Sequence, residues 1–71
     1  MEDWKEWQEY VAIAEGIQVE LEELPSEAED FACDIDDRLE DMINWMTEHK
    51  RVTSRMKESI MNIQRGVQKW L

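Results

Sequence analysis

Apolar residues recur with helical spacing in three separate segments of the chain. In the first segment they follow one another at intervals of three and four: Trp4, Trp7, Val11, Ala14, Ile17, Leu21 and Leu24. This spacing predicts an amphipathic helix over residues 3–24. Asp3 followed by Glu6 is typical of an N-terminal cap. The alternation from Ile17 to Glu22 would also suit a short strand, but a lone strand has nothing to pair with, so we prefer the helix.

The second segment begins after Pro25. Ser26 with Glu29 three residues later is the pattern of a capping box, which predicts a helix start at residue 26. From there the apolar positions alternate by four and three: Ala28, Ala32, Ile35, Leu39, Met42 and Met46. Carboxylates recur on the opposite face: Glu27, Asp30, Asp34, Asp37 and Asp41. We therefore expect a helix over residues 26–49 with a stripe of carboxylates on its outer face.

A third periodic segment completes the chain: Met56, Ile60, Ile63, Val67 and Trp70. Thr53 or Ser54 is the expected N-cap of a helix over residues 54–70. No glycine or proline precedes this cap, and a continuous helix over residues 26–70 would be a rod of roughly 65 Å that needs a coiled-coil partner. We expect a break instead, because a compact bundle buries all three apolar faces within one chain.

These segments predict an all-α fold, a small antiparallel three-helix bundle that forms a single domain over residues 1–71. Alternating helix direction would gather three tryptophans at one end of the bundle: Trp4, Trp7 and Trp45. Phe31 and Trp70 would meet at the other end. A chain of 71 residues is near the lower limit at which one core offsets the entropy of ordering the chain. A homodimer or a partner would therefore add stability.

Charge is divided unevenly along the chain. Residues 1–40 hold fifteen of the eighteen carboxylates and two bases, whereas residues 41–71 hold three acids and six bases. The two parts therefore carry about −13 and about +3 within a net charge of −10. The acidic part argues against direct binding of nucleic acid, because phosphate contacts need Lys and Arg. We expect the bases of the third helix to pair with the carboxylates of the second, within the chain or across a homodimer.

The sequence lacks the residue sets that catalysis, cofactors or metals require. Catalytic carboxylate pairs need burial of one member to separate their pKa values, and here the acids fall on the polar face. His49 is the sole histidine and Cys33 the sole cysteine, so a metal site of these ligands cannot be assembled. The two glycines lie fifty residues apart, which excludes a phosphate-binding loop. We expect no enzymatic activity, no cofactor and no metal.

The chain carries no recognisable targeting signal. Acids near the N-terminus replace the basic region of a signal peptide. The longest apolar run, Tyr10 to Ala14, is far shorter than the roughly 20 residues of a membrane span. A single cysteine suits a reducing compartment. We therefore expect a cytoplasmic protein that does not bind a membrane.

In size, acidity, tryptophan content and helical pattern, the chain resembles small accessory proteins encoded by bacteriophages, including anti-CRISPR and anti-restriction inhibitors. This resemblance is one of general character and covers no motif. It implies a non-catalytic inhibitor of the DNA-mimic type, which masks a basic and often nucleic-acid-binding surface of a larger protein in the host cytoplasm. From the charge pattern, the expected contact residues are Glu27, Asp30, Asp34, Asp37, Asp41, Glu20 and Glu23. Trp7 is added because an exposed tryptophan at the end of a small bundle is a typical interface anchor. The alternative is a self-associating structural or assembly module that uses its apolar faces.

Overall fold

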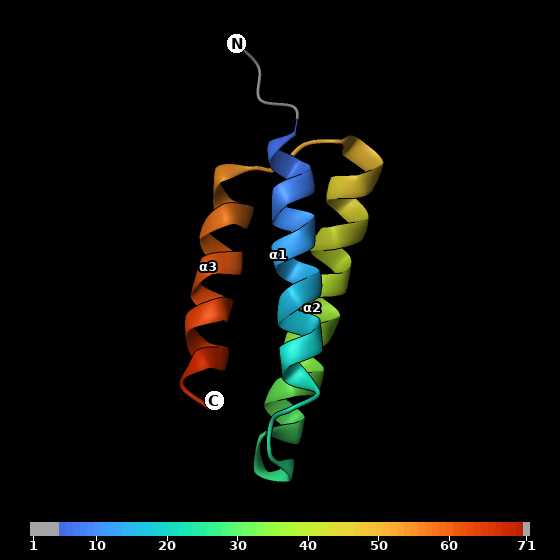
Figure 1. Ribbon diagram of the computed structural model, residues 1–71. Coiled ribbons are helices and arrows are strands. Elements are labelled where there is room, and N and C mark those ends of the chain that lie inside the picture. Colours follow the sequence, from blue (N-terminus) through green and yellow to red (C-terminus); the bar gives the residue numbers. More distant parts are fainter. Residues whose placement is uncertain (1–4, 71) are drawn as a thin grey trace.

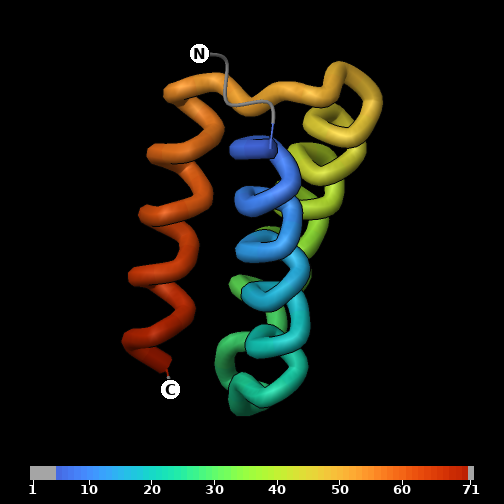
Figure 2. Tube along the Cα trace, turned by 45° about the horizontal axis from the view of Figure 1, so that its top comes forward, coloured from blue at the N-terminus to red at the C-terminus, as the bar shows by residue number. Residues whose placement is uncertain are grey.

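The computed structural model describes residues 5–70, which form three α-helices and one short 3-10 turn (Figure 1). The elements are α1 (Glu6–Leu21), the turn η1 (Ser26–Ala28), α2 (Glu29–His49) and α3 (Ser54–Gln68). Each helix runs antiparallel to the preceding one, so the start of α1 lies at the same end as the end of α2 and the start of α3 (Figure 2). The all-α three-helix bundle expected from the sequence is confirmed.

The three predicted apolar faces supply the core. Its buried side chains are each at most 7% exposed: Ala14, Ile17, Leu21, Ala28, Ile35, Leu39, Met46, Ile60 and Val67. Every one of them belongs to a face identified by its spacing in the sequence. Full burial of a large aliphatic side chain stabilises a fold by about 1.5–3 kcal/mol, so these faces hold the helices together.

α1 is shorter than the helix predicted over residues 3–24. It ends at Leu21, and the N–H of Leu24 then bonds to the carbonyl of Leu21 at 3.3 Å in a tighter turn. Pro25 prevents the helix from continuing through Leu24, because the residue before a proline avoids the helical conformation. Asp3, the predicted cap, lies outside the described residues.

The predicted capping box at the start of the second helix is wrong. Pro25 takes an extended conformation (φ −66°, ψ 161°), and its carbonyl accepts the N–H of Ala28 at 2.9 Å. Ser26 therefore lies inside η1 rather than ahead of it, and no side chain caps η1 or α2. α2 begins at Glu29, three residues later than predicted, because the tighter 3-10 turn forms first.

The predicted break between the second and third helices is confirmed. Lys50 adopts the left-handed conformation (φ 56°, ψ 42°), and its N–H bonds to the carbonyl of Met46 at 2.7 Å. Thr53 then caps α3, because its Oγ1 accepts the N–H of Met56 at 3.1 Å. Glycine usually takes the left-handed position after a helix. Here a lysine takes that position, so no glycine marks the turn in the sequence.

α3 packs more closely on α1 than on α2, and α1 lies between the other two helices in Figure 1. An ion pair joins α3 to α1, with Lys57 Nζ donating to Glu6 Oε2 at 2.7 Å. The expected ion pairs between α3 and the carboxylates of α2 do not occur within residues 5–70 of one chain. Exposed ion pairs contribute only tenths of a kcal/mol, so apolar contact decides where α3 lies.

Candidate functional site

Four aspartates run along the outer face of α2, which we name the carboxylate stripe: Asp30, Asp34, Asp37 and Asp41. All four are exposed, and they lie on the face opposite the buried Ile35 and Leu39. At 1.5 Å per residue, the stripe is about 16 Å long. An ion pair of 3.4 Å joins Asp34 to Arg38 of the same helix. Both side chains are about two-thirds exposed (64% and 66%), so solvent screens this pair and the stripe remains acidic.

A second group of acids surrounds the connection between α1 and α2, which we name the acidic pole: Glu20, Glu22, Glu23, Glu27 and Glu29. Glu20 is half-buried and the other four are exposed. The pole extends beyond the end of α3, as Figure 1 shows. Trp70, just after α3, contacts Phe31 in the first turns of α2, with ring centroids 6.3 Å apart. α3 therefore ends before the level of the connection between α1 and α2. The sequence has no basic residue between Lys5 and Arg38, so the pole has no base of its own to neutralise it.

The acids predicted to bind a partner fall into two groups, the acidic pole and the carboxylate stripe. Glu20, Glu23 and Glu27 lie in the acidic pole, which leads directly into the carboxylate stripe. Trp7 lies at the opposite end of α1, about 20 Å from Glu20 along the helix axis. Its side chain is half-buried against the core, and its Nε1 is enclosed without a hydrogen-bond partner among the described residues. Trp7 therefore does not share a surface with the acids.

An aromatic pair at the C-terminal end of α2 was missed in the sequence. The Trp45 and His49 rings stack with centroids 4.2 Å apart and an angle of 18° between their planes. His49 Nδ1 also lies 2.9 Å from the carbonyl oxygen of Trp45. Their spacing of four residues, which brings side chains together on a helix, was the available signal. The histidine thus bonds to the last turn of α2.

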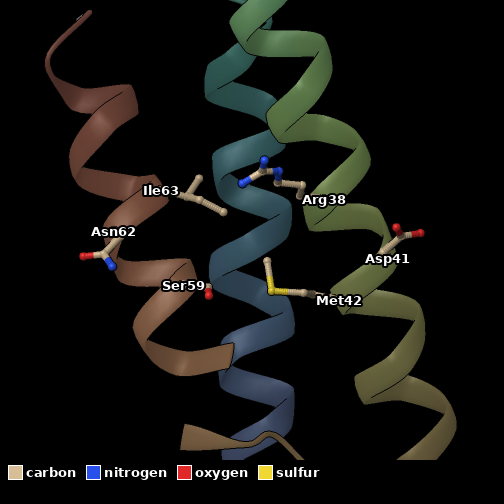
Figure 3. Close-up of a pocket in the computed structure, with 6 residues that line it drawn as sticks. All are labelled: Arg38, Asp41, Met42, Ser59, Asn62 and Ile63. Carbon is tan, nitrogen blue, oxygen red and sulfur yellow. The ribbon is translucent and has the colours of Figure 1, made fainter. Parts of the chain in front are cut away.

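An open groove separates α2 from α3 on the side away from α1, and we name it the α2–α3 groove. Figure 3 shows Met42, Ser59 and Ile63 directed toward the gap, with α1 behind it. One hollow of about 440 Å³ is lined by Arg38, Asp41, Met42, Ser59, Asn62 and Ile63. An adjoining hollow of about 370 Å³ is lined by Asp41, Met42, Trp45, Thr53 and Met56. Because both include Asp41 and Met42, the two hollows form one continuous groove.

The described residues hold no group of three or more His, Cys, Asp or Glu side chains placed to bind a metal ion. None of the described helices combines the length and apolar character that a membrane span needs. What the arrangement offers chemically is electrostatic attraction from the carboxylate stripe and the acidic pole, beside a groove with an apolar lining.

Comparison with family models, curated proteins and solved structures finds no match for this chain.

Proposed function

We propose that this chain is a non-catalytic binding protein whose carboxylate stripe and acidic pole dock on a basic surface of a larger protein. The observation that carries the proposal is the outward face of α2. It presents four aspartates at successive turns, of which only Asp34 has an ion-pair partner within residues 5–70. Carboxylates left unpaired in this way can accept hydrogen bonds from the Lys and Arg side chains of another molecule.

The electrostatic cost of the stripe supports an intermolecular role. Like charges held on one face repel one another, and this repulsion is relieved when a basic surface covers them. The net charge of −10 also attracts a basic partner over several ångströms, which speeds association. Attraction of this kind falls steeply as ionic strength rises, so binding should depend on salt.

The partner class follows from the same chemistry. Clusters of Lys and Arg that protein carboxylates can occupy are typical of surfaces that hold nucleic-acid phosphates. The chain would then act as an inhibitor that mimics the charge of DNA, in the manner of the anti-CRISPR and anti-restriction proteins of bacteriophages. It would do so in the cytoplasm of a host cell, where its single cysteine stays reduced.

The test is affinity capture from the native cell with the protein immobilised, followed by elution with salt rising from about 50 mM to 500 mM. The stripe variant, Asp30→Asn with Asp34→Asn, Asp37→Asn and Asp41→Asn, should lose the captured protein. A matched control removes four exposed acids outside the stripe and the pole: Glu9→Gln, Glu15→Gln, Glu40→Gln and Glu58→Gln.

We expect the parent and the control to capture a basic protein that salt elutes, and the stripe variant to capture at least about tenfold less of it. Equal capture by the stripe variant and the parent would refute the proposal. A salt-resistant oligomer with no basic partner would favour the self-associating module instead.

A further inference from the structure

The outer face of α3 carries the charges that the carboxylate stripe lacks. Arg55, Arg65 and Lys69 are all exposed, and within residues 5–70 none of them forms an ion pair. They lie on the side of α3 away from the buried Ile60 and Val67. The molecule therefore has an acidic outer face on α2 and a basic outer face on α3, with the α2–α3 groove between them.

Contacts across the groove fix the relative heights of the two helices. Phe31 contacts Trp70 at one end of the groove, and Trp45 and Met56 line the same hollow at the other end. Because α2 and α3 are antiparallel, each residue of α3 can be assigned a level on α2 by counting 1.5 Å per residue from these pairs.

By this count, the bases of α3 lie at the levels of the acids of α2. Arg65 lies within about 2 Å of the level of Asp37, and Arg55 within about 3 Å of the level of Glu48. Lys69 falls between the levels of Asp30 and Asp34, about 3 Å from each. Glu58 is the sole acid of α3, and it lies near the level of the uncharged Asn44.

Within one chain these matched charges face outward and do not meet. A second copy can bring them together through a two-fold axis that runs parallel to the helices, because this rotation preserves the levels and places α2 of each copy over α3 of the other. The same rotation makes neighbouring helices antiparallel, as in a four-helix bundle. A two-fold axis across the helices would instead place α2 over α2 and set the two stripes against each other.

We propose that the chain forms a two-fold symmetric homodimer in which the carboxylate stripe of each copy covers the basic face of α3 of the other. The α2–α3 grooves then face each other, and their apolar lining residues Met42, Trp45 and Ile63 are covered. This inference does not rest on the proposed function. It places self-association and binding of a basic partner on the same stripe, so the two states exclude each other.

The small size of the contact limits its strength. From Asp30 to Glu48, α2 is about 27 Å long, and a helix presents a strip about 10 Å wide. Two such strips per copy bury about 1,000 Å² in total, just under the range of stable specific interfaces. The net charge of −10 on each copy opposes association as well. The dimer is therefore weak, with a dissociation constant on the order of 100 μM.

The test is sedimentation equilibrium of the purified chain at concentrations up to about 1 mM, where a dimer of this affinity predominates. Asp37→Lys and Arg65→Glu each set like charges against each other at two symmetric contacts, so each should raise the dissociation constant about tenfold. The double variant exchanges the two signs and should restore the dissociation constant to within about threefold of the parent.

Net charge provides the internal control. Asp37→Lys makes the chain less acidic, which by itself favours association, so a weaker dimer in this variant cannot come from overall repulsion. Glu15→Lys makes the same change of charge on the exposed outer side of α1 and should leave the dimer as strong as the parent or stronger. All of these positions are exposed, and circular dichroism should show that each variant keeps its helices.

A parent that stays monomeric at about 1 mM would overturn the proposal. So would a dimer that neither single variant weakens, because the contact would then lie on another face. Single variants that weaken the dimer without restoration in the double variant would overturn the pairing of Asp37 with Arg65. The capture experiment for a basic partner is read separately, because it uses chain concentrations well below the dissociation constant of the dimer, where the stripe is uncovered.

Discussion

In the α1–α2 hairpin the apolar faces close against each other and acids cover the outside, whereas α3 carries bases outward and leaves its flank toward α2 open. The hairpin supplies seven of the nine buried core side chains when η1 is counted with it, and α3 supplies two. The link from α3 to the hairpin runs mainly through α1, by apolar contact and the Glu6–Lys57 ion pair, with Phe31 and Trp70 joining α3 to α2. The opposite charges of α2 and α3 thus do not neutralise each other, which leaves both available to other molecules.

The largest difference between the two regions should appear when core residues are shortened. Leu39 is fully buried in the hairpin, so Leu39→Ala should lower the free energy of unfolding by about 2–5 kcal/mol. Ile63 is half-buried beside the α2–α3 groove, and Ile63→Ala should cost about 1–2 kcal/mol because solvent already reaches it. Urea unfolding followed by circular dichroism measures both. Equal losses would mean that the groove is packed as tightly as the hairpin.

The link between the two regions contains one strained residue, and relieving the strain should stabilise the protein. Lys50 has a positive φ of 56°, a conformation that costs a non-glycine residue about 1 kcal/mol. Lys50→Gly should therefore raise the free energy of unfolding by up to about 1 kcal/mol. Lys50→Ala removes the same charge but keeps Cβ, so it is the matched control and should give no such gain. Thermal unfolding that ranks the alanine variant equal to the glycine variant would contradict this account.

A smaller effect should come from the ion pair that joins α3 to α1. Glu6 and Lys57 have side chains about one-third exposed (34% and 32%), so their coupling should be about 0.5 kcal/mol and should weaken with salt. A double-mutant cycle with Glu6→Gln and Lys57→Met isolates the coupling from the other contributions of each side chain. A coupling energy near zero at low salt would show that the Glu6–Lys57 ion pair does not help to hold α3 on α1.

Spacing along the sequence was sufficient to predict the helices, the core and the exposure of the stripe. Each buried core residue belongs to an apolar series that recurs at intervals of three and four, and the aspartates of the stripe lie opposite these series for the same geometric reason. Of the two expected caps, Thr53 and Ser54, the structure selects Thr53, and Ser54 is the first residue of α3.

Local pattern failed where the outcome depended on neighbouring structure. Ser26 fits a capping box, but Pro25 is extended and a 3-10 turn begins at Ser26 itself, so Ser26 lies within the turn and does not cap the helix. Lys50 gives no turn signal, since lysine adopts the left-handed conformation only when the helices on both sides require it. The charge pattern suggested that α3 pairs with α2, yet weak exposed ion pairs do not outweigh the burial of Ile60 and Val67.

The central claim is that the acids of the stripe serve contacts with other molecules and do not hold the bundle together. The most direct test is the free energy of unfolding of Asp37→Asn with Asp41→Asn, measured at about 50 mM salt and at a concentration that keeps the chain monomeric. Asp and Asn have similar helix propensities, so the comparison isolates the charge. The account predicts a stability equal to that of the parent or up to about 1 kcal/mol higher, because two mutually repelling charges are gone. A loss of about 1 kcal/mol or more would contradict it, since the stripe would then be paired within the molecule.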